Sequence, residues 1–374
     1  MTHDLTIPAA LLPRDGRFGS GPSRVRDAQL QALMAAQPGV LGTSHRQAPV
    51  KDVVGSVREG LSQLYALPAG YEVILGNGGA SSFWDAAAFS LVDHRAQHCS
   101  FGEFGSKFAA VTSSAPFLEP SVVRTSEPGD IAVPEPQDGI DVYAWPHNET
   151  STGAMAPVVR PVGAGDALTV IDGTSAAGGL ALDVAQADVY YFSPQKSFGA
   201  DGGLWFALVS PAAVERIERI AASGRWIPPT LDLATALANS RQNQTLNTPA
   251  VATLVMMNAQ VSWLNDNGCL DFATSRTSES ARRIYEWADS SSFAETFVTS
   301  HSNRSSVVAT VDLREPVDSV EIRSILKANG VVDIDPYRKL GRNQIRVGMF
   351  PAVDPDDVSA LTESIDWIVE RLLT

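Results

Sequence analysis

The sequence predicts an α/β protein built on a mostly parallel, doubly wound sheet, with a large domain followed by a smaller α/β domain. The main observation is that short apolar runs, such as residues 168–172 and 188–193, alternate with segments whose apolar residues recur at helical spacing. A second observation is that glycine and polar residues follow several of these runs directly, as they do where parallel strands end at one edge of a sheet. The chain has 374 residues, which is enough for a large core and two domains.

The first predicted elements are two helices and a strand. Residues 24–37 and 49–66 carry apolar side chains at helical spacing, and Ser23 is expected to cap the first of these helices. A strand is expected at residues 71–75, and an alanine-rich helix is expected over residues 83–91.

A glycine turn separates this strand from this helix, with the sequence Gly76-Asn77-Gly78-Gly79-Ala80-Ser81-Ser82. At such a turn, unpaired backbone N–H groups and the positive end of the helix dipole face one point, which favours a bound phosphate. The turn lacks the Gly-Lys-Ser/Thr of a P-loop and the spacing of a dinucleotide-binding fingerprint. Taken alone, it fits a tight turn without a ligand as well as a phosphate site.

The remaining elements continue the alternation. The large domain is expected to contain strands at residues 141–145, 168–172, 188–193 and 203–209, and helices at residues 211–222 and 249–264, the last with Pro249 in its first turn. A break at residues 265–268 places the large domain at residues 24–265 and the small domain at residues 266–374 together with residues 1–23. The small domain is expected to contain helix 281–288, strand 306–311, helix 319–329, strand 344–347 and helix 356–373.

Composition restricts the partners and the compartment. Asp and Glu outnumber Lys and Arg by 42 to 28, a formal charge of -14, so we expect no nucleic-acid partner, although a few arginines can still gather around a small anionic substrate. Cys99 and Cys269 lack CxxC or Cys/His spacing, so neither a disulfide framework nor a metal site is expected, and neither cysteine is given a role. No segment reads as a signal peptide or transmembrane helix, so we expect no membrane partner and a cytoplasmic location.

The stretch 190–203 contains the lysine on which the functional interpretation depends. An aromatic run ends in Ser-Pro-Gln, and Lys196 and a glycine-rich segment follow, so a strand delivers one amine to the edge of the sheet. Asp172 ends another apolar run. Pyridoxal phosphate chemistry needs these two groups, because the lysine forms the Schiff base and the carboxylate keeps the pyridine nitrogen protonated. The alternatives are a solvated loop lysine and an N-cap at Asp172 for residues 174–176.

Several short motifs along the chain match one family in order and spacing. They are Phe18-Gly19-Ser20-Gly21-Pro22, Ser44-His45-Arg46, Gly78-Gly79-Ala80-Ser81, His147-Asn148-Glu149-Thr150, Asp172, Gln195-Lys196, Asn247-Thr248-Pro249 and Arg346. On these residues the chain resembles the phosphoserine aminotransferases, which are fold-type-I pyridoxal phosphate enzymes, and its actinobacterial-like branch most of all. The resemblance implies a large domain with a seven-stranded-type, mostly parallel sheet and a smaller C-terminal α/β domain. It also implies a homodimer with shared active sites.

The resemblance implies a role for each cofactor residue. Lys196 would form the Schiff base and move the substrate Cα proton, Asp172 would pair with the pyridine nitrogen, Phe104 would stack on the ring and Thr150 would bond the phenolic oxygen. Residues of both subunits would bind the cofactor phosphate. One subunit would contribute Ala80, Ser81 and Gln195, and its partner would contribute Asn247 and Thr248.

The resemblance also implies substrate contacts and a reaction. His45 and Arg46 would bind substrate anions, and Arg346 would bind the α-carboxylate. The reaction would be amino transfer between L-glutamate and 3-phosphohydroxypyruvate, giving O-phospho-L-serine and 2-oxoglutarate in serine biosynthesis. 4-Phosphohydroxythreonine, an intermediate of pyridoxine biosynthesis, stays open as a second substrate.

This chain departs from the family where the substrate phosphate binds. The family's His-Arg pair in the C-terminal lobe is replaced by a segment with three cations, so the residue that binds the substrate phosphate stays open among Arg338, Lys339 and Arg342.

Three alternatives to this function stay open. Two are other enzymes of the same fold group, an alanine–glyoxylate aminotransferase and a cysteine desulfurase. The third is a phosphometabolite-binding regulator that uses the glycine turn without covalent chemistry. Finally, the seven tryptophans and the aromatic residues around Lys196 are interpreted as packing.

Overall fold

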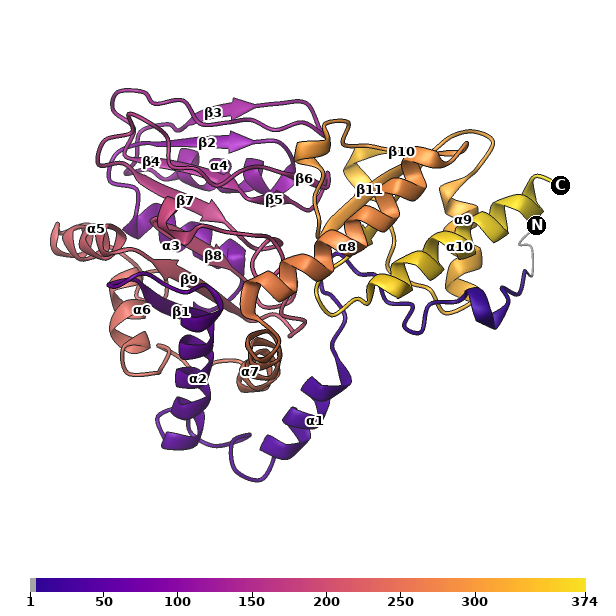
Figure 1. Ribbon diagram of the computed structural model, residues 1–374. Coiled ribbons are helices and arrows are strands. Elements are labelled where there is room, and N and C mark those ends of the chain that lie inside the picture. The colour runs from indigo at the N-terminus through magenta and orange to yellow at the C-terminus, as the bar shows by residue number, and fades with distance from the viewer. Residues whose placement is uncertain (1–4) are drawn as a thin grey trace.

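The computed structural model describes residues 5–374 and divides into two lobes, with the N-terminal segment and the C-terminal helix side by side in the smaller one (Figure 1). Within the described residues, the larger lobe is organised on a seven-stranded sheet of order β1-β9-β8-β7-β4-β2-β3. The strands are β1 (Glu72–Asn77), β2 (Ala96–Ser100), β3 (Val122–Thr125), β4 (Val142–Pro146), β7 (Leu168–Asp172), β8 (Val189–Phe192) and β9 (Leu204–Val209). The pairs from β8 to β3 are parallel, and β9 runs antiparallel to both of its neighbours.

Helices cover both faces of this sheet, which is why its central strands read as nearly continuous apolar runs. One face packs on α2 (Ala48–Leu64) and α7 (Val251–Asp266), with α1 (Asp27–Ala36) beside α7. The other face packs on α3 (Ala80–Ser90), α4 (Glu103–Ser114), α5 (Pro211–Ala222) and α6 (Leu233–Ser240). Successive strand residues serve opposite faces, so Tyr190 lies in the first core and Tyr191 in the second.

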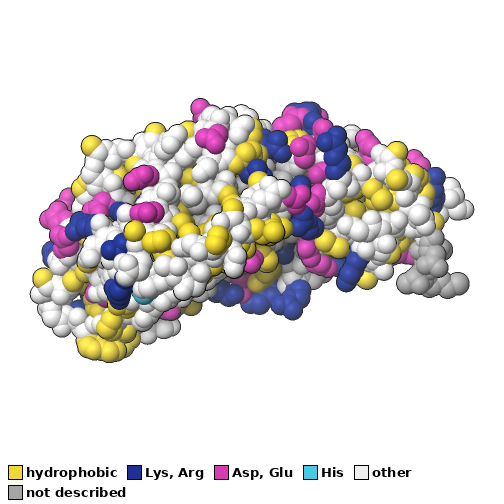
Figure 2. Space-filling view, turned by 90° about the horizontal axis from the view of Figure 1, so that it is seen from below, with side chains coloured by type: hydrophobic (Ala, Val, Ile, Leu, Met, Phe, Trp, Pro, Cys, Tyr) yellow, Lys and Arg dark blue, Asp and Glu magenta, His cyan; other side chains and the backbone are white. Residues whose placement is uncertain are grey.

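The smaller lobe has its own apolar core around an antiparallel sheet of order β10-β11-β12, made of β10 (Ala294–Thr296), β11 (Val308–Leu313) and β12 (Gln344–Gly348). Its helices are α8 (Cys269–Ser290), α9 (Ser319–Ala328) and α10 (Pro355–Leu372). Ile7 and Phe18 are buried in this core, so the N-terminal segment packs with the C-terminal lobe. Between the lobes lie the short pair β5 (Asn148–Glu149) and β6 (Ala154–Met155), and acidic and basic side chains gather where the lobes meet (Figure 2).

The predicted fold class is confirmed, whereas several predicted helix starts are wrong. The helix predicted from residue 83 begins at Ala80, and the helix predicted from residue 281 begins at Cys269. Ser23 does not cap the first helix, because α1 begins only at Asp27 and the Ser23 hydroxyl donates instead to the backbone carbonyl of Lys196. Pro249 lies before α7 rather than in its first turn. No helix within residues 5–374 combines the length and the apolar character needed to cross a bilayer.

The domain boundary at residues 265–268 stays a proposal. The break falls in the turn between α7 and α8, but α8 contributes Ala273 to the large-lobe core and Ile284 to the small-lobe core. One helix therefore spans both lobes, and a unit cut at residue 265 would lose apolar contacts on both sides.

Candidate active site

A cavity of about 340 Å³ opens at the carboxyl ends of β7 and β8 and at the first turns of α3 and α4. This is the edge where an open α/β sheet binds its ligands. The cavity collects seven of the predicted site residues and seven others, namely Gly21, Pro22, Gly79, Ala80, Ser81, Trp84, Phe104, Asn148, Thr150, Asp172, Thr174, Ser175, Gln195 and Lys196.

Lys196 is buried at the base of this cavity. Its Nζ donates to the carbonyl of Ser20 at 2.6 Å. A Cβ at position 21 would collide with Nζ, and Gly21 has φ +142°, so glycine is required there for the lysine to pass. Burial, and secondarily the charge of Arg346, lower the pKa of Lys196 to about 8. A large share of this amine is therefore neutral and nucleophilic slightly above neutral pH.

Asp172 ends β7 and lines the same cavity. Its Oδ1 accepts from the backbone N–H of Thr174 at 2.8 Å, and its Oδ2 accepts from the Tyr191 hydroxyl at 2.9 Å. The capping interpretation of Asp172 is thus correct in part, since one oxygen closes the following turn. Burial raises the pKa of Asp172, and the hydrogen bonds from Thr174 and Tyr191 oppose that shift.

The start of α3 offers donors to an anion. Gly79 is the N-cap and provides no side-chain cap, and Ala80 and Ser81 lie in the first turn, where backbone N–H groups have no acceptor within the helix. Gln195 places a buried Oε1 in the same cavity, and this oxygen has no partner among the described residues. The first-turn N–H groups are donors without an acceptor in the helix, so this end of the cavity is suited to an anionic group such as a cofactor phosphate. The Gln195 oxygen is itself an acceptor, so only the amide nitrogen of that side chain could donate to such an anion.

A buried carboxylate, Glu149, holds the backbone at the start of α4, beside the cavity. Glu149 accepts from the backbone N–H groups of Phe104 and Gly105 at 3.0 and 3.1 Å, and from the Ser151 hydroxyl at 2.7 Å. The positive end of the helix dipole at the start of α4 also attracts this carboxylate. These bonds hold the backbone of Phe104, whose side chain lines the cavity and could stack on a planar ligand.

Arg346 lies on β12 at the border between the lobes. Its guanidinium donates to the carbonyl of Thr150 at 3.2 Å and lies 5.6 Å from the centre of the Tyr337 ring. Its Nε is buried and has no partner within the described residues, and burial lowers its pKa. A buried guanidinium with a free donor favours a carboxylate ligand.

Besides Arg346, four predicted residues do not line this cavity, and they lie on two loops that meet each other. The Thr248 hydroxyl lies 3.1 Å from Nδ1 of His45, and Arg46 donates to Oε1 of Gln244 at 2.9 Å. Asn247 precedes Thr248 in the same loop, and its carbonyl accepts from the Thr245 hydroxyl at 2.6 Å. Within one subunit, the loop that carries His45 and Arg46 therefore meets the loop of residues 244–248, and neither loop lines the cavity.

The three undecided cations differ in their partners. Lys339 pairs with Glu103 at 2.5 Å, across the two lobes, and Arg342 pairs with Asp312 at 2.6 Å. Arg338 is exposed and has no hydrogen-bond or ion-pair partner in residues 5–374.

Sequence reasoning missed several residues of the site. Gly21, Asn148 and Ser175 line the cavity without an assigned role, and Trp84, interpreted as packing, lies in its wall. The motifs that contain Gly21 and Asn148 had been singled out, so a signal existed for these two residues. For Trp84 there was none, because a tryptophan in an alanine-rich helix is typical of core packing.

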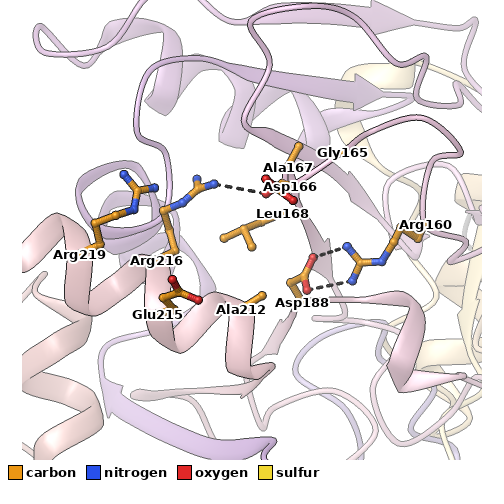
Figure 3. Close-up of a pocket in the computed structure, with 10 residues that line it drawn as sticks. All are labelled: Arg160, Gly165, Asp166, Ala167, Leu168, Asp188, Ala212, Glu215, Arg216 and Arg219. Carbon is orange, nitrogen blue, oxygen red and sulfur yellow. Dashed lines mark hydrogen bonds and ion pairs between the residues drawn. The ribbon is translucent and has the colours of Figure 1, made fainter.

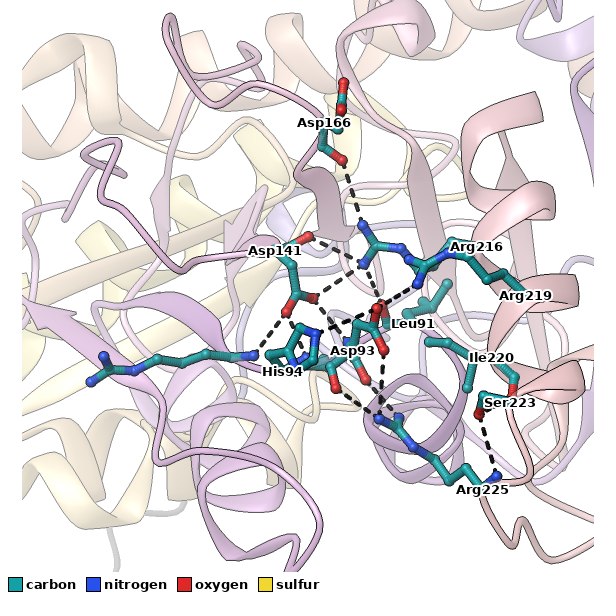
Figure 4. Close-up of polar contacts among 12 residues, drawn as sticks. Leu91, Asp93, His94, Asp141, Asp166, Arg216, Arg219, Ile220, Ser223 and Arg225 are labelled. Carbon is teal, nitrogen blue, oxygen red and sulfur yellow. Dashed lines mark hydrogen bonds and ion pairs between the residues drawn. The ribbon is translucent and has the colours of Figure 1, made fainter.

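A second cavity, of about 580 Å³, lies at the opposite edge of the sheet, where β7 begins, beside the helix α5 (Figure 3). Its arginines are already paired. Arg160 binds both carboxylate oxygens of Asp188 at 2.7 and 2.8 Å, and Arg219 binds Asp93 at 2.6 Å. Arg216 bonds Asp141 at 3.1 Å and three backbone carbonyls, those of Leu91, Asp141 and Asp166 (Figure 4). These contacts tie α5 to the sheet and leave little charge for a ligand.

Comparison with known proteins identifies the family of this chain. The family profile for class-V aminotransferases matches residues 123–334. A putative phosphoserine aminotransferase of Mycolicibacterium vanbaalenii is 59% identical over 372 residues, covering 100% of both chains. A phosphoserine aminotransferase of Rhodococcus opacus is 57% identical over 372 residues, again covering 100% of both. The crystal structure of a phosphoserine aminotransferase from Cytophaga hutchinsonii aligns with a TM-score of 0.84 at 23% identity, over 94% of this chain and 99% of that one.

These matches show a class-V aminotransferase that uses pyridoxal phosphate, which is the cofactor predicted from Lys196 and Asp172. Within that class, the chain belongs to the phosphoserine aminotransferase family. This membership favours the predicted function over the desulfurase, the alanine–glyoxylate aminotransferase and the non-catalytic regulator.

Proposed function

We propose that this protein transfers an amino group between L-glutamate and 3-phosphohydroxypyruvate, giving O-phospho-L-serine and 2-oxoglutarate. The observation that carries the proposal is the meeting of Lys196 and Asp172 in one cavity with unpaired phosphate donors, in a chain whose full-length relatives bear this name. The proposal includes a cytoplasmic location and the serine biosynthetic route. It leaves 4-phosphohydroxythreonine as a second candidate substrate.

Bound pyridoxal phosphate would supply an electron sink for the bonds at the substrate Cα. Lys196 would hold the aldehyde carbon of the cofactor and, once released by the substrate amine, would move the proton at Cα. Its position beside the Ser20 carbonyl and its lowered pKa, about 8, support this role. Asp172 would keep a proton on the ring nitrogen, and Phe104 and Thr150 would orient the ring from two sides.

The phosphate of the cofactor would lie at the start of α3, bound by the backbone N–H groups of Ala80 and Ser81 and by the amide nitrogen of Gln195. Asn247 and Thr248 lie outside this cavity in their own subunit, so we place them at the phosphate site of a partner subunit in a homodimer. The loop before α2, which carries His45 and Arg46, contacts the loop that carries Thr248. The neighbouring helix α1 exposes Leu30 and Met34, with exposed fractions of 48% and 77%, and this apolar surface is suited to burial against a second copy of the chain.

Substrate recognition would involve two kinds of cation. Arg346 would bind the α-carboxylate common to both substrates, using the Nε that has no partner among the described residues. His45 and Arg46 would bind further substrate anions. Among the three cations of the loop between α9 and β12, Arg338 is the candidate for the substrate phosphate, because Lys339 and Arg342 are already paired with carboxylates.

The experiment compares amino donors with 2-oxoglutarate as acceptor. Phosphoserine, phosphohydroxythreonine, alanine and cysteine would each be assayed at steady state with the purified holoenzyme. We expect kcat/KM to be highest for phosphoserine and at least a hundredfold lower for alanine, since a site built to pair a charged group rejects a substrate that lacks it. An alanine value equal to or above the phosphoserine value would contradict the proposed function.

A further inference from the structure

We propose that Tyr191, supported by Trp84, is a positioning residue that fixes the carboxylate of Asp172 and sets how strongly that carboxylate attracts the proton of the cofactor ring nitrogen. The inference rests on the role proposed for Asp172. It gives a function to two aromatic residues that the sequence pattern assigned to packing.

The backbone register brings Tyr191 to Asp172. The two residues are direct partners on the parallel strands β8 and β7, so their side chains leave the sheet on the same face. The Tyr191 hydroxyl lies 2.9 Å from Oδ2 of Asp172, and Nε1 of Trp84, on α3, lies 2.8 Å from the same hydroxyl. Trp84 also lines the cofactor cavity, so the three groups connect the wall of the cavity with its carboxylate.

The direction of this chain of hydrogen bonds is fixed by chemistry. An indole nitrogen can only donate, so the Tyr191 oxygen must accept from Trp84. The single hydrogen of the hydroxyl is then left for Asp172, which must accept it. Burial raises the pKa of Tyr191 well above its usual value, so the hydroxyl keeps this hydrogen throughout the working pH range.

Packing holds the Tyr191 ring in place. The side chain is fully buried, the Phe83 ring stacks on it with centroids 4.4 Å apart, and Phe108 meets it edge-on at 5.9 Å. A ring packed on both sides cannot turn its hydroxyl away from Asp172.

Each oxygen of Asp172 thus accepts a hydrogen bond within the protein, Oδ1 from the Thr174 N–H and Oδ2 from the Tyr191 hydroxyl. Burial raises the pKa of this carboxyl, which lines the cavity, and the side chains of Thr174 and Trp84 also oppose that rise. Without the Tyr191 donor the carboxylate would bind a proton more tightly, because hydrogen bonds to the charged form favour that form. It would then draw the proton away from the ring nitrogen and weaken the electron sink.

The test compares Tyr191→Phe with Tyr190→Phe. Tyr190 is the matched control, since it is equally buried, precedes Tyr191 on β8 and loses one hydroxyl contact, to Nδ1 of His147 at 3.1 Å, on the opposite face of the sheet. Three quantities are measured on each holoenzyme: kcat and KM with phosphoserine, the affinity for pyridoxal phosphate, and the pH midpoint of the visible band of the bound cofactor without substrate.

For Tyr191→Phe we expect kcat to fall about tenfold or more, the scale of one hydrogen bond to a charged group, with KM for phosphoserine nearly unchanged. The pH midpoint of the visible band should move upward. A ring with less positive charge repels a proton less, so the nitrogen that joins Lys196 to the cofactor should keep its proton to higher pH. Tyr190→Phe should leave the midpoint and kcat near wild type. Trp84→Phe, which keeps the Tyr191 hydroxyl, should shift the midpoint in the same direction by less, and it replaces Tyr191→Phe if that variant does not fold.

Equal losses in the two tyrosine variants, or an unmoved midpoint in Tyr191→Phe, would overturn the inference and leave Tyr191 as a packing residue. Because the midpoint is measured without substrate, it separates this inference from the proposed reaction. A wild-type protein that binds the cofactor but does not use phosphoserine would refute the reaction, while the midpoint shift would still test Tyr191.

Discussion

Two cavities of this protein, the candidate active site and the cavity beside α5, differ in what their polar groups are paired with. The larger one, beside α5, contains three arginines, and each of them contacts a carboxylate of the same chain. The smaller one lies at the carboxyl ends of β7 and β8. Its buried lysine, Lys196, is hydrogen-bonded to one backbone carbonyl, and its Gln195 side-chain oxygen has no partner in the described residues.

We therefore use unpaired buried polarity, rather than volume, to propose the smaller cavity as the active site. Pairing within the chain removes the charge that a ligand would use, and it contributes to stability instead. Leaving a polar group buried without a partner costs free energy, which a bound cofactor and substrate can recover. Substitutions should therefore alter chemistry in the smaller cavity and stability in the larger one.

The largest effect is expected from Lys196→Ala. Removing the amine removes both the covalent attachment point and the base that moves the Cα proton, so transamination should fall by more than about a thousandfold. The fold and much of the cofactor binding should persist, because the phosphate donors of α3 are untouched. The measurements are steady-state turnover and equilibrium dialysis with pyridoxal phosphate, and near-normal turnover in this variant would refute the assignment.

A smaller loss is expected from Arg346→Ala. Both substrates carry the α-carboxylate, so KM should rise for phosphoserine and for 2-oxoglutarate alike, by about ten- to a hundredfold, the scale of a charged hydrogen bond. Arg346 also lowers the pKa of Lys196, so the same variant should shift that pKa upward. A KM increase for only one substrate would show that Arg346 binds another group.

The pH dependence of cofactor capture should follow the lowered pKa of Lys196. Only the neutral amine attacks the aldehyde, so the rate at which apoenzyme captures pyridoxal phosphate should rise with pH and level off above about 8, where Lys196 has lost its proton. An unperturbed lysine would continue to gain rate up to about pH 10.4. Stopped-flow absorbance measures this rate, and a profile without a plateau below pH 9 would contradict the burial of the amine.

Substitutions in the larger cavity should change the stability of the protein and leave its activity nearly unchanged. Arg216→Met removes a buried guanidinium that bonds Asp141 and three carbonyls, so the free energy of unfolding should fall by about 3 kcal/mol. Arg219→Met is the control on the same helix, because this side chain is 53% exposed and its pair with Asp93 should contribute at most about 0.5 kcal/mol. Urea unfolding measures both variants, and kcat should stay within about twofold of wild type in each. A tenfold loss of kcat in Arg216→Met would show that the second cavity takes part in the reaction.

The residues that follow strand ends could be predicted from the sequence. Lys196, Asp172 and the glycine turn before α3 each interrupt an apolar run, and the topology of a parallel sheet then brings them to one edge. The order of the motifs predicted the family. It did not predict which loop cation is unpaired, because the partners of Lys339 and Arg342 lie far away in the sequence.

The supporting residues of the site could not be predicted for a physical reason. Tyr191 lies in an aromatic strand whose pattern is the same whether its hydroxyl is packed or hydrogen-bonded, and only the register of β7 and β8 places it on Asp172. Ser23 has the composition of an N-cap, but a contact with the Lys196 carbonyl replaces that local role. Contacts between distant segments decide both cases.

The most direct test of the account is to locate the cofactor on the chain. The protein has five lysines, at positions 51, 107, 196, 327 and 339, and Lys196 is the buried one among them. Holoenzyme would be reduced with borohydride, digested and mapped by mass spectrometry. The account predicts loss of the visible band and a reduced pyridoxal phosphate adduct on Lys196. An adduct confined to another lysine, or a protein that gains no visible band when pyridoxal phosphate is added, would contradict it.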